Sequence, residues 1–297
     1  MRDAEQPRGR RPSPHEPVAS RIPHPASRLY IVSTPIGNLA DISLRALETL
    51  KTVSLVLAED TRHSRTLLDR YEITTPVESY HEHNEARMTP RLIERLSSGE
   101  SMALITDAGT PLLSDPGARL VRAAIEAGVD VIPVPGASAL LAALVVSGLP
   151  AEHFTFFGFL PRKGRERSAV LEELLALRHT GVLYEAPSRV AATLGEFAAG
   201  GGGARQVVVA RELTKQFEEV RRGTAEELAR YYQATPPKGE VVIVVEGAAP
   251  AVLDEAALQE TARELLASGL TPRDVARTLI AEHGAPRNIA YRVTQGA

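Results

Sequence analysis

Carboxylate, hydroxyl and guanidinium groups gather in a few short loops of this chain, and each loop adjoins a run of apolar residues. The fullest is segment 107–117, DAGTPLLSDPG, which follows the apolar run 102–105. Its glycines and prolines favour a loop of fixed shape. Loops at the carboxyl ends of strands in an open α/β sheet bind ligands, because their backbone groups are unpaired and the next helix presents its amides. The segment is therefore either the wall of a site or a tight connection from strand to helix.

Loops of the same kind recur along the chain. They mix glycine or alanine, which let a backbone approach a ligand closely, with carboxylates and hydroxyls that can bind ribose or amine groups. These loops are 35–37, 59–62, 135–139, 158–163, 184–189, 210–215 and 238–240. If these loops line one cleft, their residue types suit a nucleoside-like cofactor.

Several other mechanisms lack their sequence signature. Segment 33–38, STPIGN, matches neither GxGxxG nor GxxxxGK[ST], and the chain contains no GxSxG elbow. The absence of cysteine excludes a thiol nucleophile, a disulfide and cysteine-ligated zinc. His81 and His83 would point the same way from a strand, but no third ligand can be identified. We therefore predict no metal site, and a polar surface or pocket edge around this pair.

The elements that must position these loops follow from the apolar runs. Strands are predicted at 29–32, 53–58, 77–80, 102–106 and 129–134, with helices near 86–98 and 117–127. This alternation predicts right-handed crossovers and a mainly parallel sheet. Later strands are predicted at 154–159, 181–184, 206–210, 217–220 and 241–245, with helices near 164–177, 188–198 and 224–232. They indicate a second α/β layer with more antiparallel character.

Length and composition predict a globular protein with two α/β domains. The 297 residues are 43% hydrophobic and 24% charged, with a net charge of −3 that argues against indiscriminate nucleic-acid binding. We expect a disordered tail at 1–28, an N-terminal α/β domain with a parallel sheet at 29–148, a C-terminal α/β domain with a mixed sheet at 149–249, and a helical unit at 254–294. No apolar run is long enough to cross a bilayer, and the lack of cysteine fits a reducing cytoplasm.

Nine segments, in this order along the chain, carry a family resemblance. They are LYIVSTPIGNLADIS, LAEDTRHS, HEHNE, LITDAGTPLLSDPG, VPGASA, GFLPRK, YEAPSR, ARELTK and KGEVVIVVEG. The chain from residue 29 to its end resembles the tetrapyrrole-methylase (class III) fold. More narrowly, it resembles the bacterial branch of 16S rRNA (cytidine-2′-O)-methyltransferases, the ribosomal small-subunit methyltransferase I family.

The resemblance implies two α/β domains with a cofactor cleft between them and a small helical unit at the C-terminus. It implies that S-adenosylmethionine is bound in the cleft, and that its methyl group goes to the 2′-oxygen of a cytidine in the decoding centre. The implied partners are 16S rRNA, within the small ribosomal subunit, and a second copy in a homodimer. The implied location is the cytoplasm, without a membrane.

The resemblance also implies roles for individual residues. Those expected to bind the cofactor are Pro35, Gly37, Asp107, Gly109, Thr110, Ser138, Ala139, Tyr184, Ala210 and Gly239. Those expected to bind RNA are Arg62, Arg162, Lys163, Arg165, Arg189, Arg211 and Lys215.

A ribose hydroxyl is a weak acid, so a base or a cation is expected beside it. We expect Glu59, Asp60 and Lys163 to be catalytic, with Glu212 and Glu240 as further carboxylates that could serve as the base. For each of these residues an ion pair that only holds a loop remains an alternative.

Two other functions stay open from the sequence. A tetrapyrrole C-methyltransferase would share fold and cofactor, although AEDTR, GFLPRK and the C-terminal helical pattern argue against it. A ribosome-assembly protein that binds RNA without catalysis would keep the fold but transfer nothing.

Overall fold

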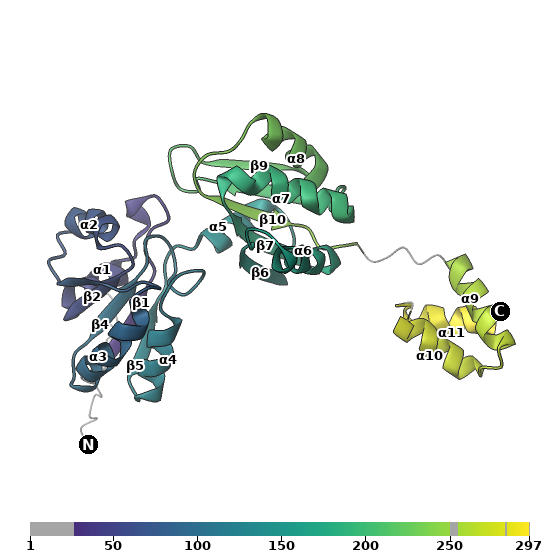
Figure 1. Cartoon of the computed structure of the whole chain (residues 1–297), viewed down its shortest axis with the longest axis horizontal. Helices are drawn as coiled ribbons and strands as arrows, with labels where there is room; N and C mark the ends of the chain where they lie inside the picture. The colour runs from purple at the N-terminus through teal and green to yellow at the C-terminus, as the bar shows by residue number, and fades with distance from the viewer. Residues whose placement is uncertain (1–26, 250–254, 283, 297) are drawn as a thin grey trace, which may run out of the picture.

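The computed structural model describes residues 27–249, 255–282 and 284–296. The expected tail at 1–28 therefore lies outside the described residues, except for its last two positions. The described chain forms two α/β layers, each built on a five-stranded sheet, and a final unit of three helices (Figure 1).

The first sheet has the strand order β3-β2-β4-β1-β5. Its strands are β1 (Arg28–Val32), β2 (Leu55–Ala58), β3 (Val77–Ser79), β4 (Met102–Ile105) and β5 (Asp130–Val134). Every pairing in it is parallel, which confirms the predicted character of this sheet. The predicted start of β2 at Val53 is wrong, because the Val53 nitrogen donates to the Thr49 carbonyl and ends the preceding helix.

Two helices cover each face of this sheet. They are α1 (Leu44–Thr52) and α2 (Thr61–Arg70), then α3 (Glu85–Ser97) and α4 (Ala118–Glu126). Successive residues of β2 serve opposite cores: Val56 packs with the residues of α1 and α2, whereas Leu57 packs with those of α3 and α4. Because both faces are covered, these strands are continuous apolar runs without alternation.

The carboxyl edge of the sheet places the loops after β1, β2 and β4 together. The crossover from β1 leads to β2 on one side, and the crossover from β4 leads to β5 on the other, so a crevice opens between β1 and β4. Thr34 and Gly109, in the loops after β1 and β4, are joined by two backbone hydrogen bonds, from Thr34 N to Gly109 O at 2.8 Å and from Gly109 N to Thr34 O at 3.1 Å. The two loops therefore form one rigid wall.

The second sheet has the strand order β6-β7-β10-β8-β9. Its strands are β6 (Phe154–Phe159), β7 (Thr180–Glu185), β8 (Gln206–Arg211), β9 (Glu219–Thr224) and β10 (Val241–Val245). Only β6 and β7 pair in parallel among them, so the predicted mixed character is confirmed. The predicted strand at 217–220 is displaced, because a turn from Glu218 N to Lys215 O occupies its start and β9 continues to Thr224.

Helix α5 (Ala139–Ser147) joins the two sheets and is absent from the sequence-based prediction. Leu140, Ala143 and Leu144 pack against residues of β7, β8 and β10, in the same core cluster as Ile36 of the first domain. Helices α6 (Arg165–Ala176), α7 (Val190–Phe197) and α8 (Ala225–Ala234) contribute to the other core of this sheet. The loop after β1 is therefore packed directly onto the second domain.

Helices α9 (Glu255–Ala267), α10 (Pro272–Glu282) and α11 (Arg287–Gln295) form a unit with its own core, which includes Leu258, Val275 and Leu279. This unit stands apart from the two sheets (Figure 1). Within the described residues, no helix is both long and apolar enough to span a membrane.

Candidate active site

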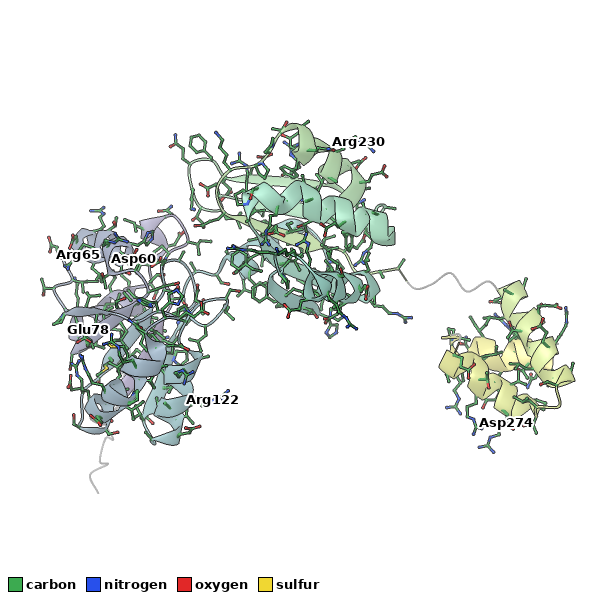
Figure 2. The ribbon with its side chains drawn as sticks, in the orientation of Figure 1. Asp60, Arg65, Glu78, Arg122, Arg230 and Asp274 are labelled. Carbon is green, nitrogen blue, oxygen red and sulfur yellow. The ribbon has the colours of Figure 1, made fainter. Side chains whose placement is uncertain are left out.

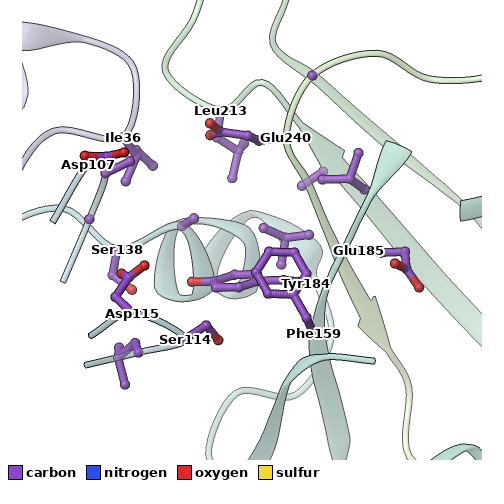
Figure 3. A pocket seen from close by; sticks show the side chains of 18 of the residues that line it. Ile36, Asp107, Ser114, Asp115, Ser138, Phe159, Tyr184, Glu185, Leu213 and Glu240 are labelled. Carbon is purple, nitrogen blue, oxygen red and sulfur yellow. The ribbon is translucent and has the colours of Figure 1, made fainter. Parts of the chain in front are cut away.

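A cavity of about 360 Å³ lies between the two sheets, at the carboxyl edge of the first (Figure 3). Its wall from the first domain is Ile36, Glu59, Asp107, Ala108, Gly109, Thr110, Leu113, Ser114, Asp115, Ser138 and Ala139. Its wall from the second domain is Phe159, Tyr184, Glu185, Ala186, Pro187, Ala210, Leu213, Gly239, Glu240, Val241 and Val242. Loops far apart in sequence thus form one site.

Eight of the ten residues expected to bind the cofactor line this cavity, namely Asp107, Gly109, Thr110, Ser138, Ala139, Tyr184, Ala210 and Gly239. The other two, Pro35 and Gly37, do not line it, although Ile36 between them does. Of the residues expected to be catalytic, Glu59 lines the cavity, whereas Asp60 and Lys163 lie outside the lining.

Side-chain hydrogen bonds fix the loop that contains Asp107. Its carboxylate accepts from the Asp60 nitrogen at 3.1 Å. The Thr110 hydroxyl lies 3.0 Å from the Ser33 hydroxyl and donates to the Ala137 carbonyl at 3.2 Å. This loop is therefore tied to the loops after β1, β2 and β5, and its shape is set before any ligand binds.

A glycine lies on each side of the cavity in a left-handed backbone conformation. The φ angles are +86° at Gly109 and +83° at Gly239, where a side chain is strained. A Cβ at Gly239 would also overlap the Glu212 carboxylate, which accepts from the Glu240 nitrogen at 3.0 Å. These glycines keep the backbone close to the cavity, as their types predict.

Two aromatic side chains, Tyr184 and Phe159, form part of the wall on the second domain. The Tyr184 ring lies 5.4 Å from the Phe159 ring and 4.9 Å from the Phe156 ring, between ring centres. Its hydroxyl points toward the side of the cavity that holds Asp115 and Ser138 (Figure 3). Burial is the main cause that raises the Tyr184 pKa, so this hydroxyl stays protonated at neutral pH.

The lining is acidic. It contains five carboxylates, those of Glu59, Asp107, Asp115, Glu185 and Glu240, and no lysine, arginine or histidine among the described residues that form it. Two of these carboxylates form ion pairs with cations behind the wall, Glu185 with Arg189 and Glu240 with Lys215. The remaining three, those of Glu59, Asp107 and Asp115, attract cationic groups and repel phosphates. A nucleotide's phosphates must therefore bind outside the cavity.

Asp115 is a lining residue that the sequence does not single out, although it lies within the quoted segment DAGTPLLSDPG. Burial, followed by the nearby charge of Glu59, raises its pKa to about 6. The signal available in the sequence is a carboxylate between two loop-forming residues, Ser114 and Pro116, which is common to many turns. Its neighbours become visible only in the folded structure.

Asp60 caps a helix. Its carboxylate accepts from the Arg62 nitrogen at 2.8 Å at the start of α2, the helix that also carries Arg65 (Figure 2). The Arg62 side chain pairs with it at 3.2 Å. Hydrogen bonds from Arg62 hold the pKa of Asp60 below its ordinary value, which disfavours proton uptake.

The cations expected to bind RNA fall into two groups. The first group is paired: besides Arg62 with Asp60, Arg189, Arg211 and Lys215 form ion pairs with Glu185, Glu219 and Glu212 at 2.5, 2.7 and 3.0 Å. Arg162, Lys163 and Arg165 are exposed, and none of their side chains forms an ion pair or hydrogen bond within the described ranges. The exposed group follows β6, beside Phe159 of the cavity wall.

A buried ion network backs the cavity. The Glu185 carboxylate is fully buried and accepts from the Thr193 hydroxyl at 2.6 Å, in addition to its pair with Arg189. Arg167, which is also buried, lies 3.8 Å from Glu185 and 2.8 Å from Glu196. Arg189 is therefore held by the protein, at the base of the YEAPSR loop.

The two sheets and the cavity between them define a known class of two-domain protein. Residues 28–229 match the family described as Tetrapyrrole (Corrin/Porphyrin) Methylases. A solved diphthine synthase superposes with a TM-score of 0.60 at 19% identity, covering 74% of this chain and 90% of that one. A solved uroporphyrin-III-C-methyltransferase of Thermus thermophilus superposes with a TM-score of 0.51 at 22% identity, covering 74% and 94%. At these identities the likeness establishes the fold.

Closer relatives narrow the class. The ribosomal RNA small subunit methyltransferase I of Synechocystis sp. is 46% identical over 269 residues, which are 90% of this chain and 96% of that protein. The protein of the same name from Mesorhizobium japonicum is 54% identical over 230 residues, covering 77% and 78%. The chain belongs to the ribosomal RNA small subunit methyltransferase I family of tetrapyrrole methylases.

Proposed function

We propose that this protein transfers a methyl group from S-adenosylmethionine to the ribose 2′-hydroxyl of a cytidine in the decoding centre of 16S rRNA. The substrate is the small ribosomal subunit, and the reaction takes place in the cytoplasm. The observation that carries the proposal is the acidic, two-domain cavity in a chain whose relatives are named for methylating this RNA.

The cavity fits the proposed methyl donor. S-adenosylmethionine, when bound, supplies a methyl group on a positively charged sulfonium, and it also carries an ammonium group. Asp107 and Glu59, lining carboxylates without an ion pair among the described residues, complement these two positive charges. Tyr184, Phe159 and Leu213 offer an apolar and aromatic surface for an adenine ring. The backbone at Gly109 and Gly239 admits close contact.

The RNA backbone binds outside the cavity in this proposal. Arg162, Lys163 and Arg165 form an exposed cationic group beside the cavity wall, where phosphates find positive charge. The pairs that engage Arg62, Arg189, Arg211 and Lys215 make these four residues weaker partners for phosphate. Base and ribose then reach the carboxylates from the mouth.

The catalytic roles of Glu59, Asp60 and Lys163 remain predictions. Glu59 reaches the cavity, and its carboxylate accepts from the Thr106 hydroxyl at 2.9 Å. Asp60 and Lys163 would have to act on the RNA at the cavity mouth, since they lie outside the lining.

A second copy of the chain is part of the proposal. Helix α5 contains no charged residue, and it leaves Leu141 and Val145 50% and 75% exposed. A helix that is apolar on all sides is normally buried. Sedimentation equilibrium of the protein and of Val145→Glu checks this: a wild-type dimer that dissociates in the variant is expected, and a wild-type monomer would contradict it.

Methylation with labelled S-adenosylmethionine tests the function. Purified protein is incubated with small subunits lacking the modification, with naked 16S rRNA, and with a tetrapyrrole precursor. Label on a cytidine 2′-oxygen in the subunits is expected. Label on the tetrapyrrole alone would show that the protein is a tetrapyrrole C-methyltransferase. Binding to subunits without any methyl transfer would indicate an assembly protein.

A further inference from the structure

Asp115 stands at the end of a strained stretch of the loop after β4. Leu112 and Ser114 have φ angles of +74° and +71°, in the left-handed region that residues other than glycine rarely occupy. Such strain persists only where surrounding structure enforces it, and it clusters in functional loops. The strained stretch brings Asp115 into the cavity wall opposite Tyr184 (Figure 3).

Every titratable group that influences Asp115 is acidic. Glu59 acts from the end of β2 and Asp107 from the same loop, and both raise the Asp115 pKa. Tyr184 faces Asp115 from β7 (Figure 3), but its hydroxyl stays protonated and adds no charge. Only the Thr106 side chain opposes them by lowering the Asp115 pKa, and the one proton of its hydroxyl is donated to Glu59 at 2.9 Å. With no basic residue among the described lining residues, Asp115 has no cation to hold it ionised. Its carboxylate therefore takes up a proton more readily than an exposed aspartate does.

We propose that Asp115 is the general base for the ribose hydroxyl, an inference that rests on the proposed methyl transfer to RNA. A lone pair of the 2′-oxygen forms the new bond to the methyl carbon, while the electron pair of the carbon–sulfur bond leaves with sulfur. The hydroxyl proton passes to an Asp115 oxygen and then to solvent. The products are the 2′-O-methyl ribose, the neutral thioether and a released proton, so atoms and charge balance.

The other carboxylates near the site are already engaged. Asp107 accepts from the Asp60 nitrogen, and Glu59 accepts from the Thr106 hydroxyl. Asp60 caps α2 and pairs with Arg62, which stabilises its ionised form. A general base works best when its pKa lies near the working pH, and Asp115, at about 6, meets this condition. Glu59 and Asp107 then act on Asp115 by keeping its surroundings negative.

The test compares wild-type protein with Asp115→Asn and with Asp69→Asn, an exposed control on α2. Methylation of small subunits is followed between pH 5 and 9, and binding of S-adenosylhomocysteine is measured by calorimetry. Asp115→Asn is expected to slow methylation by at least about 100-fold. Its affinity for S-adenosylhomocysteine should stay within about threefold of wild type, and the wild-type loss of rate toward low pH should disappear. The control should keep the wild-type rate and profile.

Two further measurements separate a base from a structural residue. Formate is added to Asp115→Ala, where this external carboxylate can replace the missing side chain. The methylation rate of the variant should rise with formate concentration, whereas the wild-type rate should not. Carbon NMR of labelled aspartate in the protein without ligand should give an Asp115 pKa near 6. Circular dichroism confirms that both variants are folded.

The outcomes are distinct. No transfer by wild-type protein to any RNA overturns the proposed function and this inference with it. Transfer by wild type with an undiminished rate in Asp115→Asn overturns the inference alone. A loss of S-adenosylhomocysteine affinity that matches the loss of rate, without rescue by formate, makes Asp115 a cofactor ligand and also overturns it.

Discussion

The carboxylate of Asp107 accepts a hydrogen bond from the backbone nitrogen of Asp60, at 3.1 Å. One oxygen of Asp107 therefore holds the loop after β2, while the residue also lines the cavity. Asp107 therefore connects the proposed cofactor-binding wall to the loop that contains Glu59.

Replacing Asp107 by alanine should weaken binding of S-adenosylmethionine at least tenfold. The change removes a negative charge from the cavity and leaves the Asp60 nitrogen without its acceptor, and a hydrogen bond to a charged group contributes about 1.5–3 kcal/mol. Calorimetry measures the affinity, and filter binding of rRNA should stay at the wild-type level. Tight cofactor binding by Asp107→Ala would show that the donor lies elsewhere.

Replacing Tyr184 tests the aromatic wall. Tyr184→Ala should weaken binding of the donor by about five- to 150-fold, since stacking of a base on an aromatic ring contributes about 1–3 kcal/mol. Tyr184→Phe keeps the ring beside Phe159 and should bind almost as wild type does. Equal losses in both variants would assign the effect to the hydroxyl and not to the ring.

The exposed cations after β6 should contribute to RNA affinity in a salt-dependent way. Lys163→Ala with Arg165→Ala should weaken binding to small subunits and reduce the slope of log affinity against log salt by about 0.7–0.9 for each phosphate that the variant no longer neutralises. Arg230→Ala, on the outer side of α8, is the matched control (Figure 2). An unchanged slope in the double variant would remove these residues from the RNA surface.

The buried network behind the cavity predicts a large effect on stability. Glu185→Ala leaves the buried Arg167 without this carboxylate and Arg189 without its 2.5 Å partner. Removing one member of a buried ion pair costs about 3–5 kcal/mol. Glu196→Ala removes a half-exposed partner of Arg167 and should cost below about 1 kcal/mol. Urea denaturation compares the two, and similar losses would contradict the central position of Glu185.

The raised pKa of Asp115 predicts a specific pH dependence of stability. The folded pKa is about 6 and the ordinary value is 3.8, so between these two pH values the folded state binds more protons than the unfolded state does. The contribution of Asp115 to the free energy of unfolding therefore falls as pH rises from about 4 to 6, and it stays low above 6. Asp115→Asn should be more stable than wild type at pH 7, and this advantage should vanish near pH 4. A difference independent of pH would show that the pKa is not raised.

The sequence predicts the sheets better than it predicts the pairings between side chains. Strands covered on both faces are uninterrupted apolar runs, so β4 and β10 stand out. Helix α5 escapes prediction because it is apolar on every side and shows no helical period. The ion pairs of Arg189, Arg211 and Lys215, and the acidic surroundings of Asp115, depend on contacts made only after folding. Residue types in loops therefore indicate where the cavity lies, but not which charges remain available inside it.

The acidic lining also bears on how the reaction cycle ends. Under the proposed function, methyl transfer turns a cationic sulfonium into a neutral thioether, so the ligand loses one positive charge while the carboxylates of the wall stay in place. Attraction between the wall and the spent donor is thereby weakened at the moment of reaction. The cavity would thus favour exchange of used for fresh donor, and product inhibition would be lower than in a neutral pocket of the same shape.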